Sequence, residues 1–194
     1  MTNFKFELSS KEIEDVFDQL PPPSKAQEEH LSRLGMDPAV TILDWTGNFN
    51  LTRTAMVEFL QNYRFEFAED AKGELTSALI IQVRNEVGDV ADLLAFRSNG
   101  QWAVWLGQVP VLGLEHALLP RLSEGLPVHR TILEYYRAGR KGTFILDKER
   151  SRFSLECAGP LLAEDKEHGE QLARDLSYQP TVIYPIADEN GANE

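Results

Sequence analysis

The residues with the clearest chemical potential form a basic segment between Arg121 and Arg152. Eight arginines and lysines and four acidic residues lie in it, which gives a local charge of +4 in a chain of net charge −12. A basic segment in an acidic protein predicts a surface that faces anions, or one that pairs with the protein's own acidic half. The candidate anion- or partner-binding residues are Arg130, Arg137, Arg140, Lys141, Lys148, Arg150 and Arg152.

Three interpretations of the basic segment compete. In a nucleic-acid contact, arginines at a turn grip phosphates while Tyr135 stacks on a base. In a small-anion site, the glycines between Ala138 and Gly142 expose backbone amides, although the spacing of a phosphate-binding loop is not there. The third interpretation is a mixed-charge surface, or an interface with the acidic half of the chain. Contiguous, exposed positive groups would favour polyanion binding, whereas internally paired ones would favour a protein-interaction scaffold.

Two tryptophans offer a second kind of site. Trp102 and Trp105 lie three residues apart on one predicted strand, so they face opposite sides of its sheet. We expect one of them to be buried. The other is either covered by a helix or exposed as a platform on which a base or a sugar stacks.

The sequence contains no complete catalytic or metal-binding signature. Asp165 and His168 are one helical turn apart, as in one helix of a carboxylate-bridged metal site, but no matching motif accompanies them. We therefore expect no metal and no cofactor, and a histidine that is hydrogen-bonded at the edge of the core. Cys157 is expected to be a buried structural thiol. The alternative function is a hydrolase built from loop carboxylates and His116, His129 or His168.

The first helices have clear start and stop signals. Ser9 and Glu12 form a capping box, and the triple proline at 21–23 ends the helix. Residues 1–23 are thus predicted to be an amphipathic helical arm, which docks into a partner, swaps between protomers or packs on its own domain. Ser24 and Gln27 start a second helix, and Gly35 ends it.

The middle of the chain mixes helical and strand patterns. Residues 40–45 predict a strand that ends at the Gly47-Asn48 turn, and Thr52 is expected to cap a helix that turns Met56, Phe59 and Leu60 inward. The pattern over 74–87 is ambiguous, and we favour a helix. Residues 93–96 and 102–106 predict a hairpin around Asn99-Gly100, whose residues tolerate the positive φ angles of a tight turn.

The second half should hold two helices and another hairpin. A helix is predicted from Pro127 to Gly139, with Val128, Ile132, Leu133 and Tyr136 on its buried face. Residues 143–146 and 152–156 predict a hairpin, and 160–176 a helix. An edge strand is expected at 181–186, and the polar residues 188–194 are typical of a disordered tail.

Length and composition limit the classes of protein to which the chain can belong. The chain has 194 residues and one cysteine, so it suits a single domain without disulfides in a reducing cytoplasm. Neither a signal peptide nor an apolar run of about 18 residues is visible, so we expect no membrane contact. The predicted fold class is α+β, with two small antiparallel β-hairpins packed against several α-helices. One globular domain should cover residues 24–187.

Three stretches of the chain resemble known sequences. They are Asp92-Leu93-Leu94-Ala95-Phe96, the Trp102/Trp105 strand with Gly107, and the run from Ala138-Gly139 to Ile145-Leu146-Asp147. Over about residues 90–176 their order resembles that in uncharacterised bacterial proteins encoded on prophages or other mobile elements. The resemblance implies no fold, activity or site. It implies a bacterial accessory protein that handles nucleic acid or meets a host or phage partner.

The sequence therefore predicts a non-catalytic binding or interaction module. Its contact surface would be the basic segment around residues 121–152, with nucleic acid or another polyanion as ligand. A protein partner or a second copy of the chain would bind through the N-terminal arm.

Overall fold

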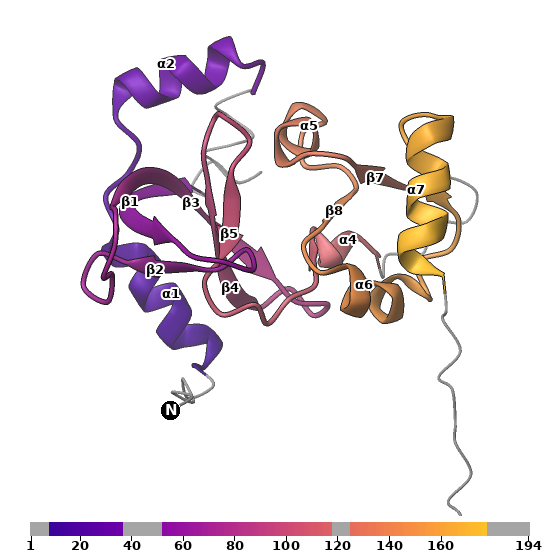
Figure 1. Cartoon of the computed structure of the whole chain (residues 1–194), viewed down its shortest axis with the longest axis horizontal. Coiled ribbons are helices and arrows are strands. Elements are labelled where there is room, and N and C mark those ends of the chain that lie inside the picture. Colours follow the sequence, from indigo (N-terminus) through magenta and orange to yellow (C-terminus); the bar gives the residue numbers. More distant parts are fainter. Residues whose placement is uncertain (1–7, 37–51, 118–124, 178–194) are drawn as a thin grey trace, which may run out of the picture.

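The structure is a computed structural model that describes residues 8–36, 52–117 and 125–177. Two β-sheets lie side by side (Figure 1). The first sheet has the order β2-β1-β3-β4-β5, and every neighbouring pair is antiparallel. Its strands are β1 (Thr52–Phe59), β2 (Phe65–Phe67), β3 (Thr76–Arg84), β4 (Val90–Phe96) and β5 (Trp102–Val104).

The second sheet is mixed and short-stranded. Its order is β6-β8-β7-β9, with β7 parallel to both β8 and β9 and β6 antiparallel to β8. The strands are β6 (Val111–Leu112), β7 (Leu126–His129), β8 (Thr143–Ile145) and β9 (Leu161–Leu162). The helices of this half are α4 (Leu114–Ala117), α5 (Ile132–Arg137), α6 (Lys148–Leu155) and α7 (Lys166–Leu176).

The predicted fold of two small hairpins on several helices is wrong. The predicted helices at Thr52 and at 74–87 are the strands β1 and β3. In β3 the consecutive residues Ala78 to Ile81 are all buried, because the middle of the first sheet is covered on both faces. A strand buried on both faces has a continuous apolar run, which periodicity alone does not distinguish from a helix.

The second predicted hairpin is also wrong. Residues 143–145 form β8 as expected, but the return strand is the helix α6. Asp147 explains this, because its carboxylate accepts hydrogen bonds from the backbone N–H groups of Glu149 and Arg150 and so caps the helix. The helix expected from Pro127 is shorter, since residues 126–129 form β7 and Thr131 caps α5. Likewise α7 begins at Lys166 rather than near Pro160.

The hairpin at Asn99-Gly100 is confirmed. Strands β4 and β5 pair with Phe96 opposite Trp102, and Gly100 has a φ of +88°. The two tryptophans do face opposite sides of the sheet. Trp102 packs against the core between the sheets, and Trp105 is buried in the core beneath α1.

The first two helices are confirmed with their capping boxes. Helix α1 spans Ser10–Gln19 and α2 spans Lys25–Arg33. Ile13 and Phe17 of α1 are 0% and 1% exposed, and the helix packs against β4. Of the alternatives for the N-terminal arm, this arrangement corresponds to a helix that packs on its own domain.

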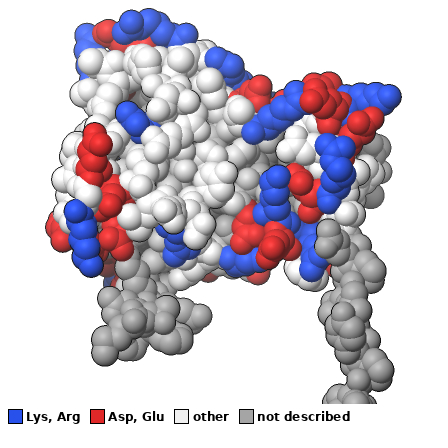
Figure 2. All heavy atoms as spheres, viewed as in Figure 1, with Lys and Arg blue, Asp and Glu red and all other residues white. Residues whose placement is uncertain are grey.

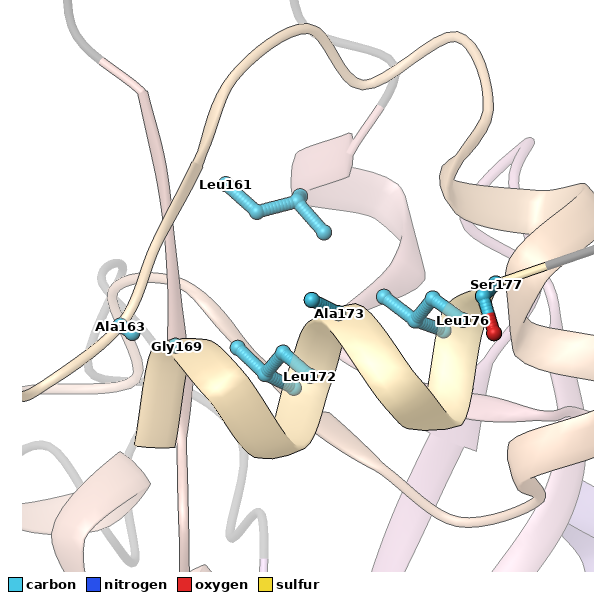
Figure 3. Close-up of a pocket in the computed structure, with 7 residues that line it drawn as sticks. All are labelled: Leu161, Ala163, Gly169, Leu172, Ala173, Leu176 and Ser177. Carbon is cyan, nitrogen blue, oxygen red and sulfur yellow. The ribbon is translucent and has the colours of Figure 1, made fainter. Parts of the chain in front are cut away.

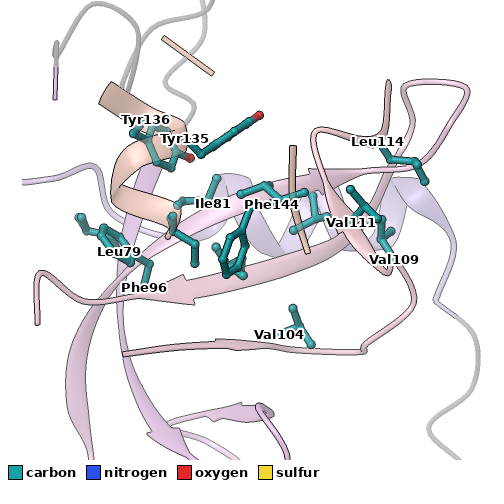
Figure 4. Packing of buried hydrophobic residues seen from close by; sticks show 14 of the residues in the cluster. Leu79, Ile81, Phe96, Val104, Val109, Val111, Leu114, Tyr135, Tyr136 and Phe144 are labelled. Atoms are coloured by element: carbon teal, nitrogen blue, oxygen red, sulfur yellow. The ribbon is translucent and has the colours of Figure 1, made fainter. Parts of the chain in front are cut away.

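The first sheet curls until its two ends meet. Arg64, just before β2, forms an isolated bridge with Val104 of β5, and the Val104 N–H donates to the Tyr63 carbonyl at 2.9 Å. The inner face of the curl, with α1 across it, encloses one core. A second core lies between the two sheets, where Ile81 and Phe96 meet Phe144 and Tyr136 (Figure 4).

Some predictions fall outside the described residues. They are the strand at 40–45, the turn at Gly47-Asn48, the strand at 181–186 and the tail at 188–194. Among the helices that the structure describes, none is both long and apolar enough to cross a bilayer.

Candidate functional site

A hollow of about 240 Å³ opens where the β4–β5 hairpin tip meets the second sheet. Aromatic and aliphatic side chains form its floor, and a few polar groups surround them, which is the usual composition of a ligand site. It lies between the turn at Ser98–Gly100 and the residues that follow β7. Its lining comprises Phe96, Ser98, Asn99, Gly100, Trp102, Arg130, Thr131, Ile132, Leu133 and Phe144.

A second hollow of about 310 Å³ is also lined by Trp102. Gly100 and Trp102 line both hollows, so the two are neighbours. We call the pair the Trp102 groove. The residues of the second hollow are Phe59, Leu60, Asn62, Tyr63, Gly100, Gln101 and Trp102.

An aromatic stack forms the wall of the groove. The ring of Tyr63 stacks on Trp102 with centroids 4.7 Å apart and planes 16° apart, and Phe144 meets the indole edge-on at 5.4 Å. Tyr63 nevertheless remains 62% exposed. Its outer face is therefore available to a ligand.

The backbone at Tyr63 is strained. Asn62 and Tyr63 have φ angles of +60° and +55°, and two consecutive positive φ angles are the pattern of a type I′ turn. Asn suits the first central position of such a turn, but the second is usually Gly, and a bulky residue there is an outlier. Strain of this kind costs about 1–3 kcal/mol and clusters at binding sites.

Most of the predicted basic residues are engaged within the protein. The Arg130 guanidinium donates to both carboxylate oxygens of Asp165, at 2.8 and 2.7 Å. Lys148 pairs with Asp175 at 2.8 Å. These two cations therefore meet the chain's own carboxylates, as the internal-pairing alternative expects.

Three further arginines bind groups of the protein itself. Arg137 Nε donates to the Leu34 carbonyl at 2.8 Å, which ties α5 to the end of α2. Arg150 donates to the carbonyls of Gly107 and Gln108. Arg140 has a φ of +61° and hydrogen-bonds the hydroxyl of Tyr135. Burial raises the pKa of Tyr135 to about 12, so this phenol stays protonated at neutral pH.

The last two predicted residues are Lys141 and Arg152. Lys141 is exposed, and its ammonium makes no ion pair with a described residue. The guanidinium of Arg152 lies over the ring of Phe153, 4.5 Å from the centroid. Figure 2 shows blue and red atoms intermixed over the lobe that holds α5 to α7, while the centre of the face is largely uncharged. The basic residues thus do not form one continuous positive patch on this face.

Neither His129 nor His168 lines the Trp102 groove. A carbonyl oxygen can only accept, so His129 Nε2 donates to the Lys141 carbonyl at 2.8 Å, while Nδ1 lies 3.5 Å from Glu164 Oε1. His168 is 4% exposed, and its Nδ1 accepts from the Glu164 N–H at 3.2 Å. His116 lies in α4.

His168 has the predicted role of a hydrogen-bonded histidine at the core edge. Its spacing from Asp165 reflects a helix cap, since the Asp165 carboxylate accepts the His168 N–H at 2.9 Å. Within the described part of the chain, no three His, Cys, Asp or Glu residues gather as a metal site would require. Cys157, predicted to be buried, is exposed. It lies just beyond α6 in a turn rather than under the sheet.

Only part of the Trp102 groove is predictable from the sequence. Patterns in the sequence indicate Trp102, Arg130 and the Asn99-Gly100 turn as candidates, but for separate reasons. No such pattern indicates Tyr63, because residues 60–64 follow a strand whose sequence predicts a helix. The Asn62-Tyr63 pair was the available signal, since Asn commonly opens a tight hairpin turn.

No family model, curated protein sequence or solved structure matches this chain.

Proposed function

We propose that this protein is a non-catalytic interaction module that binds an extended segment of a partner protein in the Trp102 groove. The single observation that carries the proposal is the aromatic stack of the exposed Tyr63 on Trp102, a residue that lines two neighbouring hollows. Tyrosine and tryptophan dominate the binding energy of protein interfaces, because each supplies a large rigid surface at low entropic cost.

The charge distribution supports a peptide over a polyanion. A nucleic acid gains affinity from cations that are free to neutralise phosphates, and the chain carries −12 overall. Arg130, the one predicted cation that lines the groove, already meets Asp165 through two hydrogen bonds. A polyanion would have to compete with that carboxylate.

The shape of the groove specifies the ligand further. Two neighbouring hollows that share Trp102 suit a chain that places one apolar or aromatic side chain in each. Asn99, Gln101 and Asn62 line the hollows with groups that can hydrogen-bond a peptide backbone. The ligand is therefore an uncharged, extended segment with two bulky side chains.

Selection from a random peptide library displayed on phage tests the proposal. Peptides selected on the wild-type protein should lose affinity for Tyr63→Asn by roughly thirtyfold, which corresponds to about 2 kcal/mol for an aromatic anchor. Asn tolerates the positive φ at this position, so the variant should remain folded.

Phe153→Asn is the matched control, because Phe153 is also 62% exposed but does not line the groove. It should bind the selected peptides as the wild type does. Equal binding by all three proteins would place the ligand elsewhere on the surface and refute the proposal.

A further inference from the structure

The outer edge of β5 is only partly paired. Among the described strands, β5 is the last of the first sheet and has β4 as its neighbour. The Trp105 N–H donates to the Leu93 carbonyl of β4 at 2.9 Å. Because residues that face one neighbour alternate along an antiparallel strand, Ala103 also directs its backbone groups to β4. Trp102 and Val104 therefore direct their N–H and C=O groups to the opposite edge.

The two ends of the curled sheet meet at Val104 but not at Trp102. Val104 forms a bridge with Arg64, and its N–H donates to the Tyr63 carbonyl at 2.9 Å. The chain from Leu60 to Arg64 is the turn between β1 and β2, which a hydrogen bond of 2.7 Å from the Leu60 N–H to the Arg64 carbonyl closes. Within the described part of the chain, the N–H and C=O of Trp102 consequently have no hydrogen-bond partner on this edge.

This unpaired edge borders the second hollow of the Trp102 groove. The turn contributes Leu60, Asn62 and Tyr63 to the hollow, and the chain around the start of β5 contributes Gln101 and Trp102. No described residue that lines the hollow is charged. An unpaired strand edge is a template for another strand, and a polypeptide supplies the alternating donors and acceptors that such an edge needs. A nucleic-acid backbone has no N–H donors and carries charge.

Given the function proposed above, we infer that the partner segment binds as an added strand, whose backbone pairs with the N–H and C=O of Trp102. Main-chain pairing provides affinity for any extended chain, whereas the rings of Tyr63 and Trp102 select its side chains. The ligand is therefore an extended, uncharged segment that must have a free backbone N–H at the residue opposite Trp102.

The edge strand β9 of the second sheet has no comparable aromatic anchor. A groove of about 320 Å³ lies between Leu161 of β9 and helix α7 (Figure 3). Its described lining consists of small and aliphatic residues and of Ser177. Aromatic anchors supply much of the affinity of protein interfaces, so the partner segment should bind at Trp102 and not at β9.

Peptides from the phage selection, synthesised with one backbone nitrogen methylated at a time, test the pairing. Successive N–H groups of an extended strand point to opposite edges, so only one of them should meet the Trp102 carbonyl. Methylation there should weaken binding at least about tenfold, because it removes the donor and leaves the carbonyl unpaired. Methylation of the residue on either side is the matched control and should weaken binding less than about threefold.

Amide hydrogen exchange of the full-length protein, resolved by NMR, reports on the same contact from the other side. In the free protein the Trp102 amide should exchange at least about tenfold faster than the Ala103 amide, because only Ala103 faces β4. Saturation with a selected peptide should slow the Trp102 amide at least about tenfold and leave Ala103 unchanged. Ala173→Glu places a carboxylate at an exposed position in the groove beside α7, and should bind the peptides as the wild type does.

The possible results separate this inference from the proposed function. Peptides that tolerate a methyl group at every position, but still lose affinity for Tyr63→Asn, would refute strand pairing and leave the proposed function intact. Peptides that bind Tyr63→Asn as they bind the wild type would refute both. A Trp102 amide that exchanges as slowly as Ala103 in the free protein would overturn the inference, because the edge would already be occupied by the chain or by a second copy. Weaker binding by Ala173→Glu would assign the segment to β9 instead.

Discussion

The side chain of Asp92 is held by several hydrogen bonds from the backbone. It is fully buried on β4, and its carboxylate oxygens accept from the backbone N–H groups of Leu93, Leu106 and Gln108, each at 2.8 Å. Burial raises the pKa of Asp92, and the three hydrogen bonds and the charge of Arg64 oppose that rise. One carboxylate thus fixes the connection that carries the chain from the first sheet to the second.

Replacing Asp92 by Asn should lower the free energy of unfolding by about 1–3 kcal/mol, because the amide NH₂ group then faces a buried backbone donor. Denaturant unfolding measures the change. Asp89→Asn, in the exposed turn before β4, is the matched control and should unfold as the wild type does. Equal stability of Asp92→Asn and the control would mean that the three hydrogen bonds contribute nothing net.

At the element scale, the ends of the helices join distant parts of the chain. Asp165 caps α7 and also holds Arg130 at the end of β7. The backbone N–H of His168, and then the Arg130 guanidinium, hold the pKa of Asp165 below its ordinary value of 3.8. A lowered pKa in the folded state means that the stabilisation is present above pH 3.8 and is lost as the pH falls through the folded-state pKa.

Asp165→Asn should therefore reduce stability at neutral pH but not in acid. Asn can still cap the helix, so the variant loses mainly the charge that meets Arg130. The difference in unfolding free energy from the wild type should be constant above about pH 5 and should shrink toward pH 3. Asp15→Asn, on the exposed face of α1, should show no such dependence. A difference that grows as the pH falls would contradict the assigned role of Asp165.

Helix α1 offers a second test at this scale. Phe17 is 1% exposed and lies against the first sheet, with the Arg53 guanidinium 5.1 Å from its ring centroid. Phe17→Ala should cost about 3–5 kcal/mol of stability, as large truncations in cores do. Lys11→Ala, on an exposed position of the same helix, should cost almost nothing. An unchanged melting temperature for Phe17→Ala would restore the alternative of a detachable arm.

At the scale of the whole molecule, the positive charges help to connect its parts. Arg150 links α6 to the chain that leaves the first sheet, and Arg137 links α5 to α2. Lys141, in contrast, is exposed and forms no ion pair within the described residues. Removing the charge of Arg150 and removing that of Lys141 should therefore change the stability of the protein by different amounts.

Arg150→Ala should lower the unfolding free energy by about 1–2 kcal/mol, and Lys141→Ala should leave it unchanged within about 0.5 kcal/mol. Binding to single- and double-stranded oligonucleotides, measured across a salt series, provides the functional comparison. We expect no steeply salt-dependent binding by the wild type. A binding constant that falls steeply with salt would instead support a polyanion surface, provided that the slope of its logarithm against the logarithm of the salt concentration is smaller in magnitude by about 0.9 in each variant.

The features that can be predicted from the amino-acid sequence are the local ones, which are stabilised by interactions among a few consecutive residues. The two capping boxes, the stop at Gly35 and the Asn99-Gly100 hairpin each involve neighbours along the chain, and the structure has all of them. The opposite directions of Trp102 and Trp105 follow in the same way from the pleat of one strand.

Long-range packing, in contrast, determines which strands are buried on both faces and which groups surround the charged side chains. β3 is apolar on both sides because α1 covers one face of the first sheet and the second half of the chain covers the other. Arg130 and Asp165 are 35 residues apart, and Trp102 and Tyr63 are 39 apart, yet each pair is in contact. No local pattern specifies such pairs, because the free energy of bringing them together depends on how the whole chain packs.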